Sequence, residues 1–212
     1  MSKKFVQYGC GLSAPKEWIN FDVSPTLRIQ KIPLFGSLFR SFSSTKFPTN
    51  VRYGDIIKGL PIPDQYCDGL YCSHTLEHLS LKDFRTALKN SHKILKKGGV
   101  FRCIVPDLEY AARKYINALD QGDHQASLGF IGKDTLLGQQ QRPEGINGLI
   151  RSYLGNSNHL WMWDKHSLGD ELIKSGFRTV KTCSFNDSEF DEFNLVEEKN
   201  RFINAVALEA IK

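Results

Sequence analysis

No apolar run in this 212-residue chain is long enough to cross a bilayer, and no secretory signal precedes its first apolar segment. The five cysteines are odd in number and include no CxxC pair, which is typical of reduced thiols. The net charge of +5 comes from 28 basic and 23 acidic residues scattered along the chain, which gives no reason to expect a nucleic-acid partner. We therefore expect a cytoplasmic protein built as a single domain over 1–212.

Short apolar segments alternate with helical patterns over most of the chain. Strands are expected at 5–8, 18–23, 51–53, within 65–72, and at 100–106, 177–185 and 203–211. The clearest helix spans 81–96, with Ser80 and Asp83 as a capping box and Gly98 as the stop. Asp107 and Asp164 are expected to cap helices at 108–120 and up to about 175. This alternation, closed by a hairpin, indicates an α/β sheet with an antiparallel edge.

The most informative stretch is the polar run SHTLEHL at 73–79, which separates an apolar strand from the helix that begins after Ser80. A strand, a polar cluster, a helix and a further strand follow one another here. That order places Ser73, His74, Glu77 and His78 at the carboxyl edge of a parallel sheet, where ligands of open α/β proteins bind.

A second site signal is the turn Gly9-Cys10-Gly11 after the first strand, followed by Asp22 at the end of the second. Glycines let a backbone approach a ligand closely, and an acid in this place can accept hydrogen bonds from ribose hydroxyls. The third glycine of a dinucleotide fingerprint is missing, and Asp22 follows Gly9 at much less than the roughly 20 residues that such a fingerprint needs. NAD and FAD are therefore disfavoured, and a cofactor with ribose but no phosphate fits better.

The ordered motifs resemble a class I S-adenosylmethionine-dependent methyltransferase of the type-11-like branch. They are Gly9-Cys10-Gly11, the strand 18–22, Gly54-Asp55-Ile56, the run 73–79 and the segment 95–99. The resemblance covers about residues 4–116. Through 159–164 and the closing strands the chain is also similar to a bacterial subgroup often associated with surface-glycan genes. The methyltransferase resemblance implies S-adenosylmethionine as cofactor. It also implies a Rossmann-like, seven-stranded, mostly parallel sheet with an antiparallel terminal hairpin.

The resemblance also implies site residues by position. The cofactor would contact Gly9, Cys10, Gly11, Asp22, Val23, Asp55, Ile56, Ser73 and His74. If the acceptor is a hydroxyl, a base must take its proton, and the candidates are His74, His78 and His159. Asp107, Tyr110, His159 and Trp161 are candidate substrate contacts, for a small molecule or a glycan methylated on oxygen or nitrogen. No metal is needed for this chemistry. Two departures are Gln7, where many members carry an acid, and a first helix that is nearly absent.

Two segments stand apart from the regular pattern. Residues 24–50 contain no acid but several basic and aromatic residues, and the expectation is an amphipathic helix packed on the sheet. The sharper alternative is that 27–42 meets an anionic membrane or a lipid-linked substrate. Residues 121–163 form a long irregular insertion with aromatic and hydrogen-bonding side chains, among them Tyr153, Asn156 and Asn158, and we expect it to be a substrate lid.

Other interpretations of the same residues remain open. The match of His74, Glu77 and His78 to H-x-x-E-H would suit a zinc hydrolase, if the run is helical. A methyltransferase-like domain could bind a cofactor or a partner without chemistry. Asp22 and Asp55 could cap turns, His159 could be a half-buried structural histidine, and Cys10, Cys72 and Cys103 could be small buried groups.

Overall fold

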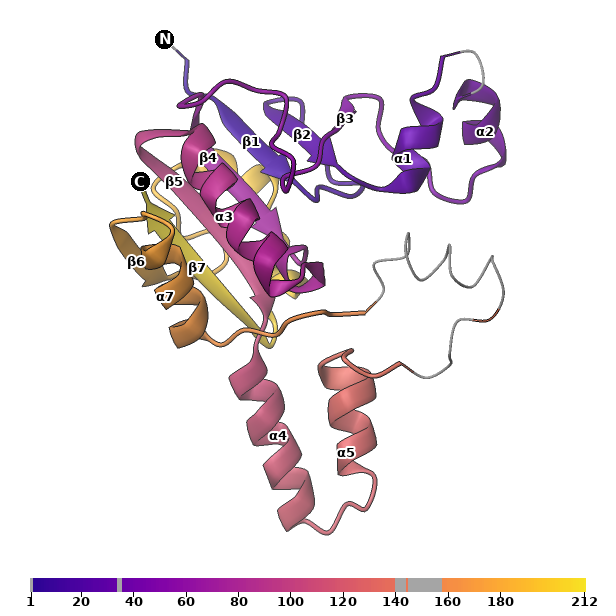
Figure 1. The fold of residues 1–212 in the computed structure, drawn as a ribbon, viewed down its shortest axis with the longest axis vertical. Coiled ribbons are helices and arrows are strands. Elements are labelled where there is room, and N and C mark those ends of the chain that lie inside the picture. Colours follow the sequence, from indigo (N-terminus) through magenta and orange to yellow (C-terminus); the bar gives the residue numbers. More distant parts are fainter. Residues whose placement is uncertain (1, 34–35, 140–143, 145–157) are drawn as a thin grey trace.

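One mixed sheet organises the chain, of which the computed structural model describes residues 2–33, 36–139, 144 and 158–212 (Figure 1). Its strands are β1 (Phe5–Tyr8), β2 (Trp18–Asp22), β3 (Val51–Tyr53), β4 (Cys67–Ser73), β5 (Leu95–Pro106), β6 (Thr179–Thr182) and β7 (Ala205–Ile211). They lie in the order β3-β2-β1-β4-β5-β7-β6. The pairs among β1 to β5 are parallel, whereas β7 is antiparallel to both β5 and β6. The expected Rossmann-like sheet with an antiparallel terminal hairpin is confirmed.

Local signals fixed most element ends, with one exception. Helix α3 (Leu81–Ile94) is capped as expected, because the Ser80 hydroxyl accepts a hydrogen bond from the Asp83 N–H at 3.2 Å. The expected continuation to Lys96 is wrong, since β5 already begins at Leu95. The backbone at Gly98 and Gly99 pairs with Lys212 over 2.9 and 3.0 Å, and this contact with the C-terminal strand outweighs the helical pattern.

In the described ranges, the α-helices that pack on the sheet cover one of its two faces. Helix α3 and helix α7 (Lys165–Lys174) pack there through buried residues such as Phe84, Leu88, Leu168 and Leu172. Burial of such large aliphatic and aromatic side chains is the main favourable term in forming this layer. Asp164 caps α7 with a full capping box, as the sequence predicted in part.

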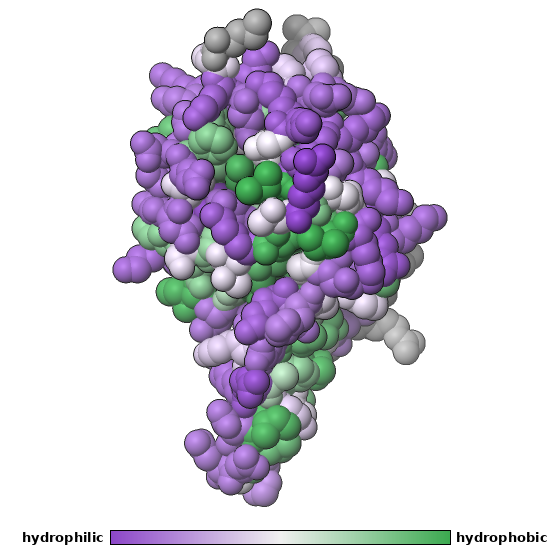
Figure 2. All heavy atoms as spheres, turned by 90° about the vertical axis from the view of Figure 1, so that its left-hand side faces the viewer, coloured by the Kyte–Doolittle hydropathy of each residue, from purple (hydrophilic) through white to green (hydrophobic). Residues whose placement is uncertain are grey.

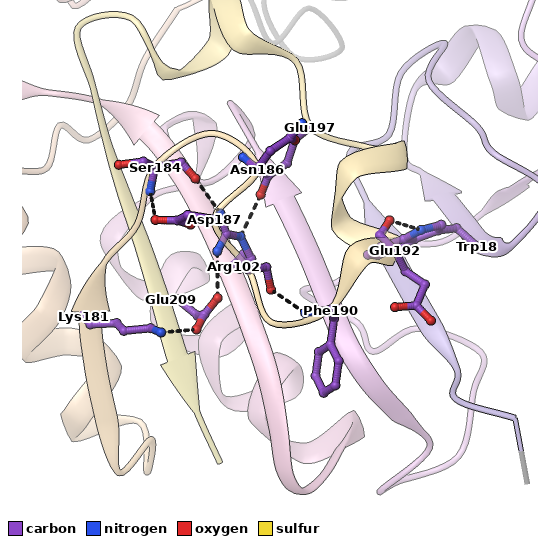
Figure 3. Close-up of polar contacts among 11 residues, drawn as sticks. Trp18, Arg102, Lys181, Ser184, Asn186, Asp187, Phe190, Glu192, Glu197 and Glu209 are labelled. Carbon is purple, nitrogen blue, oxygen red and sulfur yellow. Dashed lines mark hydrogen bonds and ion pairs between the residues drawn. The ribbon is translucent and has the colours of Figure 1, made fainter.

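The opposite face has short 3-10 turns where a helical layer would be expected. The segment 183–204, with turns at Asp191–Leu195 and Lys199–Phe202, lies across it. Phe193 is fully buried there against Phe5, Trp18 and Tyr71. The Trp18 indole donates to the Glu192 carbonyl at 3.0 Å (Figure 3). The connection between β1 and β2 contains only turns, which confirms the near absence of a first helix.

A buried guanidinium fastens this segment to the sheet. Arg102, in β5, is fully buried and bonds Glu197 at 2.7 Å, Glu209 at 2.7 Å and Asp187 at 2.9 Å. It also donates to the Ser184 carbonyl at 2.9 Å, and Lys181 adds a second cation to Glu209 at 3.0 Å (Figure 3). Arg102 therefore joins β5, β7 and the connection between β6 and β7 through charge-assisted hydrogen bonds.

Two helical projections extend from the sheet. Helices α1 (Pro25–Gln30) and α2 (Gly36–Phe42) follow the carboxyl end of β2, and α4 (Leu108–Asp120) follows that of β5 (Figure 1). Helix α5 (Ala126–Gly129) and a π-helical turn (Phe130–Asp134) run back along α4, where Tyr115 packs against Phe130. The expectation that all of 121–163 is irregular was therefore wrong for 126–134. Figure 2 shows apolar surface along this lower projection.

The expectation for 24–50 is met by α1 only. Leu27 is buried against Cys10, Phe47 and Val51, so α1 packs on the sheet edge. In α2 the aromatic Phe42 is 84% exposed, and Leu38 and Phe39 are exposed too. The packed-helix expectation is therefore wrong for α2 (Leu34 and Phe35 lie outside the described residues). None of the helices within the described ranges is long and apolar enough to cross a membrane.

Replacing Arg102 by methionine should cost about 3–5 kcal/mol of unfolding free energy, because buried carboxylates would lose their cation. Urea denaturation measures this loss. Arg113→Met is the matched control, since that guanidinium pairs with Glu109 on an exposed helix and should contribute less than about 1 kcal/mol. Equal effects of the two variants would show that the Arg102 network does not hold the fold.

Candidate active site

The predicted cofactor segments meet at one edge of the sheet. Because β1, β2, β3 and β4 are parallel neighbours, their carboxyl ends lie side by side. The turn at 9–11, Asp22, Asp55 and Ser73 follow or end these strands in turn. The chain crosses from one side of β1 to the other at this point, and such a switch point is where open α/β sheets bind ligands.

The glycine turn is built for close approach. Gly9 and Gly11 have φ values of +64° and +54°, which side-chain-bearing residues rarely adopt. A Cβ atom on Gly9 would lie 2.0 Å from the Thr75 hydroxyl oxygen, so the turn packs directly against the segment after β4. Cys10 is buried, and burial raises the pKa of its thiol to about 12, which rules out a thiolate nucleophile at neutral pH.

Asp22 is held between two backbone segments. One carboxylate oxygen accepts from the Gly11 N–H at 2.9 Å and the other from the Ser24 N–H at 2.8 Å. The turn-capping interpretation is thus true, yet each carboxylate oxygen has a second lone pair for a ligand hydroxyl. Val23, next to it, exposes an apolar side chain. The Asp22 carboxylate is therefore held in one orientation at the end of β2, with lone pairs to spare.

The third strand contributes less than the resemblance suggested. Asp55 accepts from the Ile57 N–H at 2.9 Å, so it also caps a turn. Ile56 is buried in the main core, which turns most of its side chain away from solvent.

Gln7 is buried as well, and its amide donates to the Ser13 carbonyl at 2.9 Å and to Asn20 at 2.6 Å. Gln7 in β1 thus bonds both the connection after the glycine turn, at Ser13, and the neighbouring strand β2, at Asn20.

The run 73–79 is not the helix that a zinc-hydrolase motif requires. Only Leu76–His78 form a 3-10 turn, and His74 has a φ of +49° outside it. The His74 Nε2 atom bonds the Arg201 carbonyl at 2.9 Å, and its Nδ1 lies 3.5 Å from Glu77 Oε1. Burial lowers the pKa of His74, but the nearby Glu77 carboxylate and the bond to the Arg201 carbonyl outweigh it, and the pKa is raised.

Glu77 is the centre of a cluster that the sequence had only hinted at. Its side chain is 1% exposed, and within the described part of the chain neither carboxylate oxygen has a hydrogen-bond partner. His78 Nε2 lies 3.9 Å from Glu77 Oε1, and the rings of His78 and His159 are 5.1 Å apart. His159 is 8% exposed, its Nδ1 is unpartnered, and burial lowers its pKa.

Backbone bonds hold the segment around His159 onto this turn. The N–H groups of Leu160 and Trp161 donate to the Glu77 carbonyl at 2.8 and 3.1 Å. The Asn158 carbonyl accepts from His78 Nδ1 at 3.1 Å. Neither Asn158 nor Arg201 could be found from the sequence as partners of these histidines, because both act through a main-chain carbonyl on a distant segment.

The candidate substrate residues separate into exposed and buried groups. Tyr110 and Trp161 expose their rings, whereas Asp107 caps α4 by accepting from the Glu109 N–H at 2.8 Å. Trp163 belongs to the core, where its ring stacks on Phe84 at 4.1 Å. Tyr153 and Asn156 lie outside the described residues.

Comparisons with known proteins agree with this arrangement. The model of a family described as methyltransferase domain matches residues 7–103, from β1 through most of β5. This confirms the family resemblance that the sequence motifs carry. No curated protein matches the chain.

Solved structures share the fold at low sequence identity. A SAM-dependent methyltransferase from Thermotoga maritima, described as a possible histamine N-methyltransferase, superposes with a TM-score of 0.52 at 18% identity, covering 100% of this chain and 83% of its own. PigF with SAH gives 0.50 at 13% identity and covers 99% and 50%. A SAM-dependent methyltransferase from Archaeoglobus fulgidus gives 0.49 at 18% identity, covering 99% and 86%.

Proposed function

We propose that this chain, which is a class I S-adenosylmethionine-dependent methyltransferase, methylates an oxygen or nitrogen of a small molecule or a glycan. The observation that carries the proposal is the cluster of His74, His78 and His159 around the buried Glu77 carboxylate. It directly follows β4, beside the segments that fit the cofactor.

The residues at the carboxyl edge fit S-adenosylmethionine. The backbone of Gly9 and Gly11 presents no side chain, and Asp22 has lone pairs to spare for two ribose hydroxyls. The Ser73 hydroxyl is buried at the end of β4 with no partner, which suits a group that completes the site. When bound, this cofactor supplies an electrophilic methyl group on a sulfonium.

The imidazoles provide for the proton of an acceptor hydroxyl. The C–O bond would form as the S–C bond breaks, and the hydroxyl proton would pass to a ring nitrogen. His78 donates from Nδ1 to Asn158, so its Nε2 carries the free lone pair. The lowered pKa of His159 keeps that ring neutral at pH 7, as a base requires. Both ring nitrogens of His74 face partners, and this residue would position Glu77.

Exposed aromatic rings favour a sugar as acceptor. Tyr110 and Trp161 expose their rings on segments that follow β5, and such rings suit the apolar faces of a polyhydroxylated ring. The projection of α4 and α5 from the same edge supports the proposed lid role of 121–163. The subgroup resemblance points the same way.

We also propose that 27–42 contacts an anionic lipid surface. Helix α2 exposes Leu38, Phe39 and Phe42, while Arg28, Lys31 and Arg40 lie in or beside the two helices and no acid occurs between Asp22 and Asp55. Apolar rings together with cations are what an interfacial segment needs, and each cation adds about 1 kcal/mol near an anionic surface.

Asp22→Ala should lose about 2–4 kcal/mol of S-adenosylhomocysteine binding, because charge-assisted hydrogen bonds to the ribose would vanish. Isothermal calorimetry gives the affinity. Asp120→Ala, at the exposed end of α4, should bind like the wild type. Since Asp22 also caps two turns, the melting temperature of the Asp22→Ala protein is measured in parallel. Unchanged affinity in a folded Asp22→Ala protein would reject Asp22 as the ribose ligand.

His159→Ala should leave cofactor affinity nearly intact but lower turnover by roughly 10²–10⁴-fold, and Trp161→Ala should also lower turnover. Release of S-adenosylhomocysteine in the presence of fractionated cellular glycans and small molecules measures turnover. Ile173→Ala, an exposed apolar residue on α7, serves as the control. A loss of melting temperature that fully accounts for the lost turnover would favour a packing role.

Phe39→Ser combined with Phe42→Ser should abolish co-sedimentation with vesicles that contain anionic phospholipid. Binding by the wild type should weaken with salt, because the electrostatic part is screened. Leu128→Ser with Ile131→Ser removes exposed apolar side chains from the other projection and should have no effect. Binding that is equal in both double variants would place the lipid contact elsewhere.

A further inference from the structure

The buried Glu77 carboxylate carries a charge that its described surroundings leave uncompensated. The side chain is 1% exposed, and neither oxygen has a hydrogen bond from any residue that the structure describes. His74 Nδ1 at 3.5 Å and His78 Nε2 at 3.9 Å are too far for strong hydrogen bonds. A buried carboxylate without a partner is costly, so a positive group is expected beside it.

Two imidazoles converge on the same carboxylate. Ligand atoms of Glu77, His78 and His159 all lie within 4.8 Å of one another. We propose that these three residues bind one divalent transition-metal ion, with Zn²⁺ the best fit. Two neutral imidazoles and one carboxylate are a ligand set that zinc accepts, whereas magnesium prefers oxygen ligands alone. The set differs from the H-x-x-E-H triplet, because His159 comes from a distant segment and His74 is not part of it.

The hydrogen bonds around the ligands present the correct nitrogen atoms. The Asn158 carbonyl can only accept, so it fixes the proton on His78 Nδ1 and leaves Nε2 for a metal. The Nδ1 of His159 is buried and has no hydrogen-bond partner among the described residues, so it too can face a metal. Carbonyl groups behind ligand imidazoles orient metal sites in this manner.

The three ligands are also locked in place relative to one another. The Glu77 carbonyl accepts from the N–H groups of Leu160 and Trp161, so the turn that carries Glu77 and His78 is joined to the segment that carries His159. Bringing the three ligand atoms around one ion therefore needs an adjustment of the side chains and no movement of the backbone. The ligand atoms lie within 4.8 Å of one another. Two ligands of one zinc ion are at most about 4 Å apart, because each bond is about 2 Å long, so the side chains must close in slightly around the ion.

Three protein ligands leave a coordination position open. His78 is half-buried, which gives this position a route to solvent. If the proposed methyl transfer holds, on which this one step rests, bound zinc takes the place of His78 and His159 as a base: an acceptor oxygen in the open position would lose its proton to solvent more easily. The competing occupant of the cluster is a proton on His74 that pairs with Glu77 without a metal.

Calorimetric titration of the chelator-treated, full-length protein with ZnCl₂, without cofactor or acceptor, tests the site. The expected stoichiometry is one zinc per chain. Glu77→Gln, His78→Ala and His159→Ala should each weaken binding at least tenfold, since each removes a ligand. His124→Ala removes an exposed histidine and Cys183→Ser the least buried thiol, and both should bind as the wild type does.

The proposal would be overturned if the wild type bound no zinc, or if all three ligand variants bound zinc as tightly as the wild type does. Affinity for S-adenosylhomocysteine, measured on each protein, shows whether a variant is folded. If Glu77→Gln does not fold, the zinc affinity of His78→Ala, which replaces a half-buried residue, provides the test. Loss of cofactor binding in the wild type would instead contradict the proposed function, so the two failures are distinguishable.

Discussion

The buried guanidinium of Arg102 is the interaction on which the active edge depends. It stands in β5 and holds Glu197, Asp187 and the Ser184 carbonyl, so it fixes the segment that covers the helix-free face. That segment ends near Arg201, whose carbonyl orients His74. A structural charge network is thereby continuous with the Glu77 cluster. Because a guanidinium cannot be deprotonated in proteins, Arg102 itself stays charged over the physiological pH range.

The near absence of a first helix explains why such a network is needed. With only turns between β1 and β2, the sheet face around Phe5 and Trp18 has no helix to cover it. The 3-10 turns that replace it bury few aliphatic side chains, and short 3-10 segments contribute little by themselves. Aromatic packing around Phe193 and the ion pairs of Arg102 supply the missing attachment. Stability and site geometry are therefore coupled in this chain.

The sequence predicted features that local physics decides. Caps at Ser80, Asp107 and Asp164 and the approximate positions of the strands followed from short-range patterns and turn residues. It failed where a distant partner decides: β5 starts early because Lys212 pairs with Gly98 and Gly99. For the same reason the sequence grouped His74 with Glu77 and His78, while the fold brings His159 to that carboxylate. Main-chain carbonyls such as that of Arg201 leave no trace in a side-chain pattern.

The roles proposed for Asp22 and His159 would combine packing with chemistry in one side chain. Asp22 caps two turns, and those bonds hold its carboxylate where a diol could meet the remaining lone pairs. His159 is buried, and burial lowers its pKa, so the ring stays neutral and able to accept a proton or a metal. In both cases the structural bonds reduce the motion that would otherwise have to be lost on binding. Burial of a polar residue at a strand end is thus an argument for function when some of its bonding capacity remains unused.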